Sequence, residues 1–402
     1  MEISWENKVV PLCRQLISKK SYSGQEKEMV DFLERTFAEL LFDEVRVDSY
    51  GSITATMKGK RSGLKILLDA HIDTVPADNE GQWSVHPFEG VLKEGKIYGR
   101  GASDMKGALS AMIVAVSEFA RATRKDFAGE ITIAGVVHEE CFEGIGAANI
   151  GKFIGPDVVI IGEATELNLN IGQRGRAEVV VETFGQSAHS SNPENGRNAV
   201  YAMCELIAEI QKLPVAVHPV LGKGILELTD IKSSPYPGAS VVPDYCRATF
   251  DRRTIAGEKI ADVLAPIEKL IAAKKPRIDA KAQIAYGRET CYTSATIEGE
   301  RFFPAWIMDG QDFLVKTAHA ALKRALDDEV SIKSYSFCTN GSFYAGIQGI
   351  PTLGFGPSRE NIAHIVDEYV EIAQLVGACK GYYGILEDLT GGKKGLSPKE
   401  EG

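Results

Sequence analysis

Long apolar runs, paired cysteines and an excess of basic residues are all missing from this sequence of 402 residues. No window approaches the ~18 apolar residues of a membrane span, and no basic stretch followed by an apolar one stands near Met1, so we expect no membrane contact and a cytoplasmic location. The seven cysteines are scattered and odd in number, which predicts buried free thiols. The formal net charge of -10 argues against a nucleic-acid partner, and we expect small-molecule partners instead.

The composition, with 44% hydrophobic and 25% charged residues, is that of an ordinary globular protein, and the length favours two domains. Short apolar runs indicate buried strands, and they alternate with stretches of helical periodicity. This alternation predicts an α/β sheet with helices on both faces. The predicted strands cover 66–68, 131–137 and 158–161, and the predicted helices cover 108–122 and 24–41, where Ser23 and Glu26 have capping-box spacing.

The pattern changes near Arg174. Partly alternating strands and two helices follow, which predict an α+β domain, and a helix at 311–325 then resumes the first pattern. We therefore expect one domain made of residues 1–173 and 304–402, with a second domain of residues 174–303 inserted into it. The composition of 390–402 predicts disorder. The inserted domain is expected to hold strands at 177–182, 224–228, 247–250 and 282–286, and helices at 198–212 and 259–273.

Five side chains that could bind a metal follow apolar runs or lie in loops: His71, Asp104, Glu140, Glu163 and His364. Singly they have ordinary explanations, since Asp104 would suit a helix N-cap and Glu139-Glu140 a solvated pair at a strand end. Together, their imidazoles and carboxylates are what a pair of zinc-like ions needs, and one shared carboxylate would make five ligands sufficient. Four of the positions come at the carboxyl ends of predicted strands, where ligand sites form in open α/β sheets.

Several stretches of the chain resemble the zinc-dependent family of acetylornithine deacetylase, succinyl-diaminopimelate desuccinylase, aminoacylase and glutamate carboxypeptidase. The resemblance spans roughly residues 10 to 385, and its motifs recur in the family's order. The stretches are Leu-Leu-Asp-Ala-His-Ile-Asp-Thr-Val-Pro at 67–76, the glycine-rich segment 99–107, Glu-Glu at 139–140, Gly-Glu-Ala at 162–164 and Ala-His at 363–364.

The resemblance implies a role for each matching residue. His71 and Glu163 would bind one zinc, Glu140 and His364 the other, and Asp104 would bridge the two. Asp73 would orient His71, Glu139 would act as general base, and the Asp104–Met105 peptide bond would be cis. The fold implied is a mixed-sheet, di-zinc exopeptidase-like catalytic domain with an inserted α+β lid or dimerisation domain.

Residues outside the metal cluster are expected to contact the substrate. His189 resembles the family histidine that stabilises the oxyanion, in dimeric relatives across the subunit interface, which implies a homodimer; a turn histidine is the alternative. Arg253 resembles the arginine that grips a substrate carboxylate, and a surface ion pair is the alternative. Asn340 and Gly341 fall where relatives differ, near the expected pocket, and the stretch from Cys338 resembles a subgroup linked to selenium-dependent purine catabolism.

The function expected is hydrolysis of the amide bond of N-acyl amino acids or short peptides, through a metal-activated water with Glu139 as general base. One alternative keeps the fold and the metals but cleaves a carbamoyl or other non-peptide amide. A more remote alternative is a non-catalytic metal-binding protein. Zinc is the expected metal, although cobalt or manganese would also suit these ligands.

Overall fold

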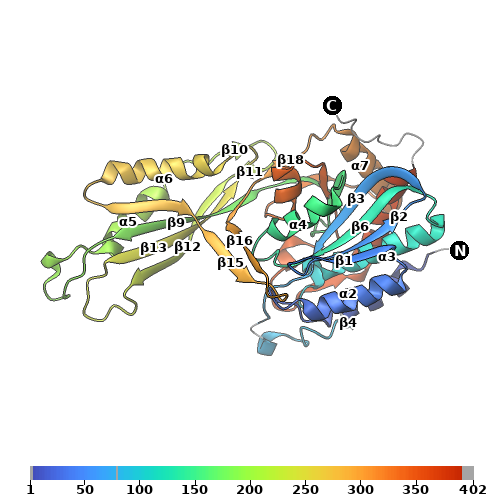
Figure 1. The fold of residues 1–402 in the computed structure, drawn as a ribbon, viewed down its shortest axis with the longest axis horizontal. Helices are drawn as coiled ribbons and strands as arrows, with labels where there is room; N and C mark the ends of the chain where they lie inside the picture. Colours follow the sequence, from blue (N-terminus) through green and yellow to red (C-terminus); the bar gives the residue numbers. More distant parts are fainter. Residues whose placement is uncertain (1–2, 78–79, 392–402) are drawn as a thin grey trace.

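A nine-stranded mixed sheet forms the larger part of the computed structural model, which describes residues 3–77 and 80–391 (Figure 1). Its order is β1-β2-β6-β3-β7-β20-β8-β18, and β19 also pairs with β8. β3 lies inside the sheet and runs parallel to β6 and β7 on either side. The strands are β1 (Glu44–Val47), β2 (Ile53–Lys58), β3 (Arg61–His71), β6 (Ala128–Val136), β7 (Val158–Ile161), β8 (Leu169–Gln173), β18 (Trp306–Ile307), β19 (Ile332–Tyr335) and β20 (Thr352–Gly354).

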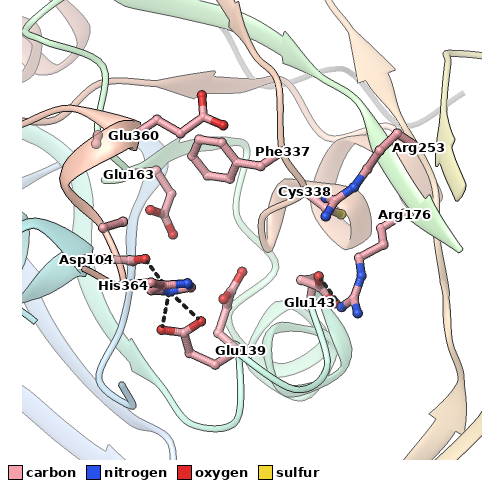
Figure 2. A pocket seen from close by; sticks show the side chains of 13 residues that line it. Asp104, Glu139, Glu143, Glu163, Arg176, Arg253, Phe337, Cys338, Glu360 and His364 are labelled. Atoms are coloured by element: carbon pink, nitrogen blue, oxygen red, sulfur yellow. Dashed lines mark hydrogen bonds and ion pairs between the residues drawn. The ribbon is translucent and has the colours of Figure 1, made fainter. Parts of the chain in front are cut away.

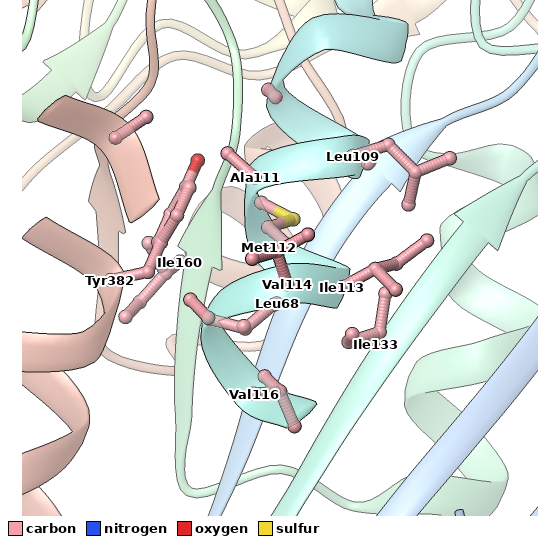
Figure 3. Packing of buried hydrophobic residues seen from close by; sticks show 14 of the residues in the cluster. Leu68, Leu109, Ala111, Met112, Ile113, Val114, Val116, Ile133, Ile160 and Tyr382 are labelled. Atoms are coloured by element: carbon pink, nitrogen blue, oxygen red, sulfur yellow. The ribbon is translucent and has the colours of Figure 1, made fainter. Parts of the chain in front are cut away.

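Helices cover both faces of this sheet, because side chains alternate between the faces along each strand. On β3, Leu67 packs in the cluster that contains residues of α4 (Ile145–Ile154), whereas Ile66 and Leu68 pack in the larger cluster on the other face. Figure 3 shows α3 (Gly107–Thr123) laid across Leu68, Ile133 and Ile160 of three strands. The other helices of that larger cluster are α1 (Trp5–Ile17), α2 (Lys27–Glu39), α7 (Phe313–Leu326) and α8 (Ile372–Gly391).

The predicted mixed α/β architecture is therefore confirmed. One local prediction is wrong: α2 begins at Lys27 without a capping box, because the Ser23 hydroxyl donates to Asp73 instead. The cysteines are free, as predicted, but Cys204 is exposed and Cys141 only partly buried. Thr390 and Gly391 belong to α8, and the rest of the segment predicted to be disordered lies outside the described residues.

A second, five-stranded sheet has its own hydrophobic cluster and extends to the left in Figure 1. The chain leaves the large sheet after Gln173 and returns to it at Trp306. The order is β12-β13-β9-β14, and β17 pairs with β9. The elements are β9 (Gly175–Phe184), α5 (Ala199–Ile210), β12 (Ile225–Ser234), β13 (Tyr245–Thr254), α6 (Ile260–Lys274), β14 (Asp279–Ile284) and β17 (Phe302–Phe303).

The remaining elements are short. In the described part of the chain, no helix is both long and apolar enough to cross a membrane. The small strands are β4 (Val91–Lys93), β5 (Lys96–Tyr98), β10 (Val217–His218), β11 (Gly222–Lys223), β15 (Tyr286–Thr290), β16 (Thr296–Glu300) and β21 (Tyr369–Glu371), and the short turns are η1 (Glu80–Gln82), η2 (Ala102–Lys106), η3 (Pro193–Asn195), η4 (Ser342–Ile347) and η5 (Glu360–Ile362).

Candidate active site

Three neighbouring parallel strands deliver acidic and imidazole side chains to one edge of the large sheet. β3 ends at His71, Glu139 and Glu140 come shortly after β6, and Glu163 comes shortly after β7. The carboxyl ends of parallel strands meet at the same edge, so these side chains converge although they are far apart in the sequence. The buried apolar residues of each strand hold the three strands in register, and this register brings the strand ends together at one edge.

Asp104 and His364 reach the same edge from loops. Asp104 lies in η2, just before α3, and its peptide bond to Met105 is cis, as the resemblance implied. Gly101 precedes it with a φ of 83°, where a Cβ would lie 2.8 Å from Thr74, so a side chain would be excluded both by conformation and by space. His364 follows η5 with a φ of 63°.

The Asp104 carboxylate lies between two pairs of side chains. Figure 2 shows it beside Glu163 and His364. Its Oδ1 is 2.7 Å from His71 Nε2, which is 3.5 Å from Glu163 Oε1. Its Oδ2 is 3.0 Å from His364 Nε2, which is 3.1 Å from Glu140 Oε2. One carboxylate thus links two histidine–glutamate pairs, which is the arrangement that two ions with a shared ligand require.

The cluster gathers carboxylates that the protein alone does not stabilise in ionised form. Burial raises the pKa of Glu163 well above its usual range, and the Asp104 carboxylate raises it further. Burial also raises the pKa of Glu139, against the influence of His71. Asp104 is the exception, because hydrogen bonds with His364 and His71 outweigh burial and lower its pKa. Divalent cations would favour the ionised carboxylates, so the donor set fits two such ions.

Distance alone does not separate the ligands from the general base. His71, Asp104 and Glu140 offer atoms that all lie within 4.8 Å of one another, and so do His71, Glu139 and Glu163. Among the described residues, Glu139 Oε1 is buried and has no hydrogen-bond partner. The role of Glu139 as base rather than ligand therefore stays a prediction.

Asp73 holds several parts of the cluster together. His71 Nδ1 lies 2.8 Å from the Asp73 backbone oxygen but 3.6 Å from its carboxylate, so the backbone oxygen is the nearer acceptor. The carboxylate instead accepts from the backbone N–H groups of Glu139 at 3.0 Å and Glu140 at 3.2 Å, and from the Ser23 hydroxyl at 2.7 Å. Asp73 thus orients His71 through its backbone and the Glu139-Glu140 pair through its side chain.

A further buried carboxylate, Glu368, holds the loop of Asp104. It accepts from Arg100 Nη1 at 2.6 Å and from the backbone N–H groups of Gly101, Ser103 and Asp104 at 3.1, 2.7 and 3.1 Å. Because Glu368 lies four residues after His364, one side chain connects the loops that carry two of the predicted ligands. No local pattern predicts this contact, since Glu368 and Asp104 are 264 positions apart.

A cavity of about 400 Å³ opens onto the cluster. One end carries the acidic residues and His364, and the other carries two arginines of the smaller sheet, Arg176 and Arg253 (Figure 2). Cys338 also lines the cavity, and burial raises the pKa of its thiol well above the usual range. The lining residues are Asp104, Glu139, Glu140, Glu143, Glu163, Ala164, Arg176, Arg253, Phe337, Cys338, Glu360, Ala363 and His364.

Five of the predicted site residues are not among those lining this cavity in the described part of the chain, namely His71, Asp73, His189, Asn340 and Gly341. His71 and Asp73 belong to the cluster described above. His189 is exposed, and its Nδ1 accepts from Ser191. Asn340 is buried and occupied, because its Nδ2 donates to Asp69 at 2.9 Å and its Oδ1 accepts from the Gly144 N–H at 3.0 Å. Gly341 is buried beside Asn340. The geometry favours a structural role for Asn340, and a direct contact with substrate stays a prediction.

The site contains residues that the sequence prediction missed, chiefly Glu143, Arg176 and Glu368. Each makes its main contacts with partners distant in the sequence, such as the bond between Arg176 and Glu143, 33 positions apart. Glu143 lies three residues after Glu140, and this proximity to a predicted ligand was the one signal that could have drawn attention to it.

Comparisons with known proteins show the family of this chain. Residues 67–388 match the model of peptidase family M20/M25/M40. The chain is 31% identical over 382 residues to YgeY, an uncharacterized protein of Escherichia coli (strain K12), with 93% of this chain and 92% of that protein covered. It is 28% identical over 403 residues to the succinyl-diaminopimelate desuccinylase of Cereibacter sphaeroides (strain ATCC 17025 / ATH 2.4.3), covering 94% and 98%.

A solved structure shares the fold. The tripeptidase from Staphylococcus aureus subsp. aureus Mu50 superposes with a TM-score of 0.74 over 95% of this chain and 98% of that one, at 18% identity. The chain therefore belongs to peptidase family M20/M25/M40. It is a metal-dependent amidohydrolase, as the sequence resemblance implied.

Proposed function

We propose that this enzyme holds two divalent ions, most simply zinc, and cleaves the amide bond of N-acyl amino acids or short peptides that carry a free carboxylate. The observation that supports this best is the split of the two Asp104 oxygens between His71 with Glu163 and His364 with Glu140. Two ions bound there would polarise the scissile carbonyl and lower the pKa of a water molecule.

Glu139 is proposed to move the proton. Its buried Oε1 has no hydrogen-bond partner among the described residues, so it is available to accept a proton from the attacking water and to deliver it to the leaving amine. The Asp73 carboxylate fixes the backbone that carries Glu139, so the base is held in place from behind. Exchange of the carboxylate for an amide would remove the proton acceptor and keep the size of the side chain.

Arg253 is proposed to bind the carboxylate of the substrate. It lies on the wall of the cavity opposite the acidic cluster, and its Nε donates to Asp251 at 2.8 Å, which leaves its terminal nitrogens for a ligand. A cavity of about 400 Å³ is within the range that holds a small ligand such as an N-acyl amino acid. A substrate with a carbamoyl or other non-peptide amide and a carboxylate would fit in the same way, with its amide at the metal cluster and its carboxylate at Arg253.

Residues 174–303 are proposed to be an inserted lid and dimerisation domain, and the chain a homodimer. His189 belongs to this segment and is exposed in the single chain, so a second copy would have to supply it to the cavity. There it would donate to the oxyanion that forms during attack. The cytoplasmic location expected from the sequence stays a prediction.

Glu139→Gln tests the proposed function. The variant should bind as much metal per chain as the wild type, measured by elemental analysis, while hydrolysis of a panel of acetyl-, succinyl- and carbamoyl-amino acids and dipeptides collapses. Wild-type turnover in the variant would refute Glu139 as the base. The panel also identifies the acyl group, because it separates deacylase from carbamoyl hydrolase activity.

A further inference from the structure

We propose that Glu143 and Arg176 form a specificity subsite that selects a neutral hydrogen-bonding group, such as a carboxamide, on a substrate whose carboxylate binds Arg253. The inference rests on the proposed function for the position of the carboxylate. It adds the class of substrate that the enzyme accepts, namely an N-acyl amino acid with one carboxylate and a carboxamide side chain.

Two arginines face the cavity from neighbouring strands of the smaller sheet. Arg176 of β9 and Arg253 of β13 lie directly opposite each other in the antiparallel register. Asp251 accepts from Arg176 Nε at 3.1 Å and from Arg253 Nε at 2.8 Å, so one carboxylate separates two cations that would otherwise repel. Arg176 Nη1 donates to Glu143, whereas the terminal nitrogens of Arg253 have no hydrogen-bond partner among the described residues.

Glu143 distinguishes the two arginines from each other. Its Oε1 accepts from Arg176 Nη1 at 2.9 Å, and Figure 2 shows it between Arg176 and Glu139. The residue lines the cavity although it is only 8% exposed, and its Oε2 has no hydrogen-bond partner within the described ranges. A buried carboxylate oxygen without a donor is unfavourable, so a ligand with an N–H group would satisfy it.

Charge decides which ligand fits. Arg176 pairs with both Glu143 and Asp251, whereas within the described part of the chain Arg253 pairs with Asp251 alone, so the substrate carboxylate is placed at Arg253. A second carboxylate would stand against Glu143 and be repelled. A carboxamide can instead donate to Glu143 and accept from Arg176. An apolar side chain would leave Glu143 Oε2 without a donor, and a site with an unpaired buried polar group discriminates strongly against such a ligand.

The spacing is also suitable. The Asp251 carboxylate accepts from the Nε atoms of both arginines, so the two guanidinium groups lie close enough for one small ligand to contact both. A ligand can therefore reach Arg253 with one group and the Glu143–Arg176 pair with the other.

Binding of N-acetylglutamine and N-acetylglutamate by calorimetry tests the subsite. The protein would be the metal-loaded full chain with Glu139→Gln, which prevents turnover during the titration. N-acetylglutamine should bind about ten-fold or more tightly than N-acetylglutamate. Adding Glu143→Gln should reduce that preference about five-fold or more, mainly because N-acetylglutamate then binds more tightly.

Two further variants make the test independent of folding defects. Glu178→Gln is the matched control, because Glu178 lies on β9 with Arg176 but pairs with Arg301 at 3.1 Å, and Glu178 does not line the cavity. This variant should leave the preference for N-acetylglutamine unchanged. Arg176→Lys approaches the subsite from its other member and should weaken N-acetylglutamine binding about ten-fold, because lysine lacks the guanidinium fork.

Equal affinity for the two ligands, no binding of either, or a preference that Glu143→Gln leaves unchanged would overturn the proposal. Turnover of N-acetylglutamine by the wild type separates this result from the proposed function. Discrimination without turnover would refute the proposed function and support the subsite, whereas turnover with equal affinities would refute the subsite alone.

Discussion

Glu368→Gln should destabilise the protein and weaken metal binding, although Glu368 is not a predicted ligand. The carboxylate is fully buried and accepts from Arg100 and from three backbone N–H groups of the loop that ends at Asp104. Glutamine keeps the size of the side chain, but it removes the charge that pairs with the buried Arg100 and turns an N–H₂ group toward N–H donors.

The magnitude follows from burial. Arg100 is 4% exposed, so its cation would be left without its partner inside the protein, and breaking a buried pair in this way costs about 3–5 kcal/mol. Burial raises the pKa of Glu368 to about 6, so the carboxylate is ionised at pH 8 and the comparison belongs there. The free energy of unfolding of the metal-free chain should therefore fall by about 3–5 kcal/mol in urea at pH 8.

Glu371→Gln is the matched control, because Glu371 lies in the same segment, is partly exposed and stands 3.8 Å from Arg359. It should change the stability by less than about 1 kcal/mol. Competition with a chelator should show weaker metal binding in Glu368→Gln but not in the control, since only Glu368 holds the Asp104 loop. Stability and metal affinity that match the wild type in both variants would refute the reasoning.

Three further predictions concern other residues. His189→Ala should keep its metal and lose turnover, and mixing it with Glu139→Gln under proven subunit exchange should restore activity; an absence of rescue would contradict action across a dimer. Metal affinity should fall as the pH is lowered from 9 to 6. Asp104 and Glu140 raise the pKa of His364 to about 10 in the metal-free chain, and metal binding must displace that proton. Chelator competition at several pH values measures this affinity, and a pH-independent affinity would refute the prediction. Asn340→Ala should lower the free energy of unfolding in urea by about 2 kcal/mol, because it removes one donor to Asp69 and the acceptor of the Gly144 N–H. A raised KM at unchanged stability would show instead that Asn340 binds substrate.

The central strands and the ligand edge could be predicted because their signal is local. β3, β6 and β7 are buried on both faces, so each appears in the sequence as a continuous apolar run that ends close to a polar residue. β12 was predicted only at its start, since it is an edge strand with mostly exposed side chains. α8 was not predicted. Its sequence contains several glycines, which have low helix propensity, and its packing in the large hydrophobic cluster stabilises it instead.

The site could be predicted only where residue type and order carried the information. His71, Asp104, Glu140, Glu163 and His364 were found in this way, and the structure brings them together. Contacts that form through the tertiary fold left no trace in the sequence. These include Glu368 with the Asp104 loop, Glu143 with Arg176 and the occupied amide of Asn340.

The two-metal assignment is tested most directly by titrating the metal-free chain with zinc while hydrolysis of an accepted N-acyl amino acid is measured. We predict that the rate of hydrolysis rises to its plateau at two equivalents of zinc per chain, because the Asp104 carboxylate joins two separate histidine–glutamate pairs. A plateau already reached at one equivalent, or hydrolysis that persists without metal, would contradict the two-metal site.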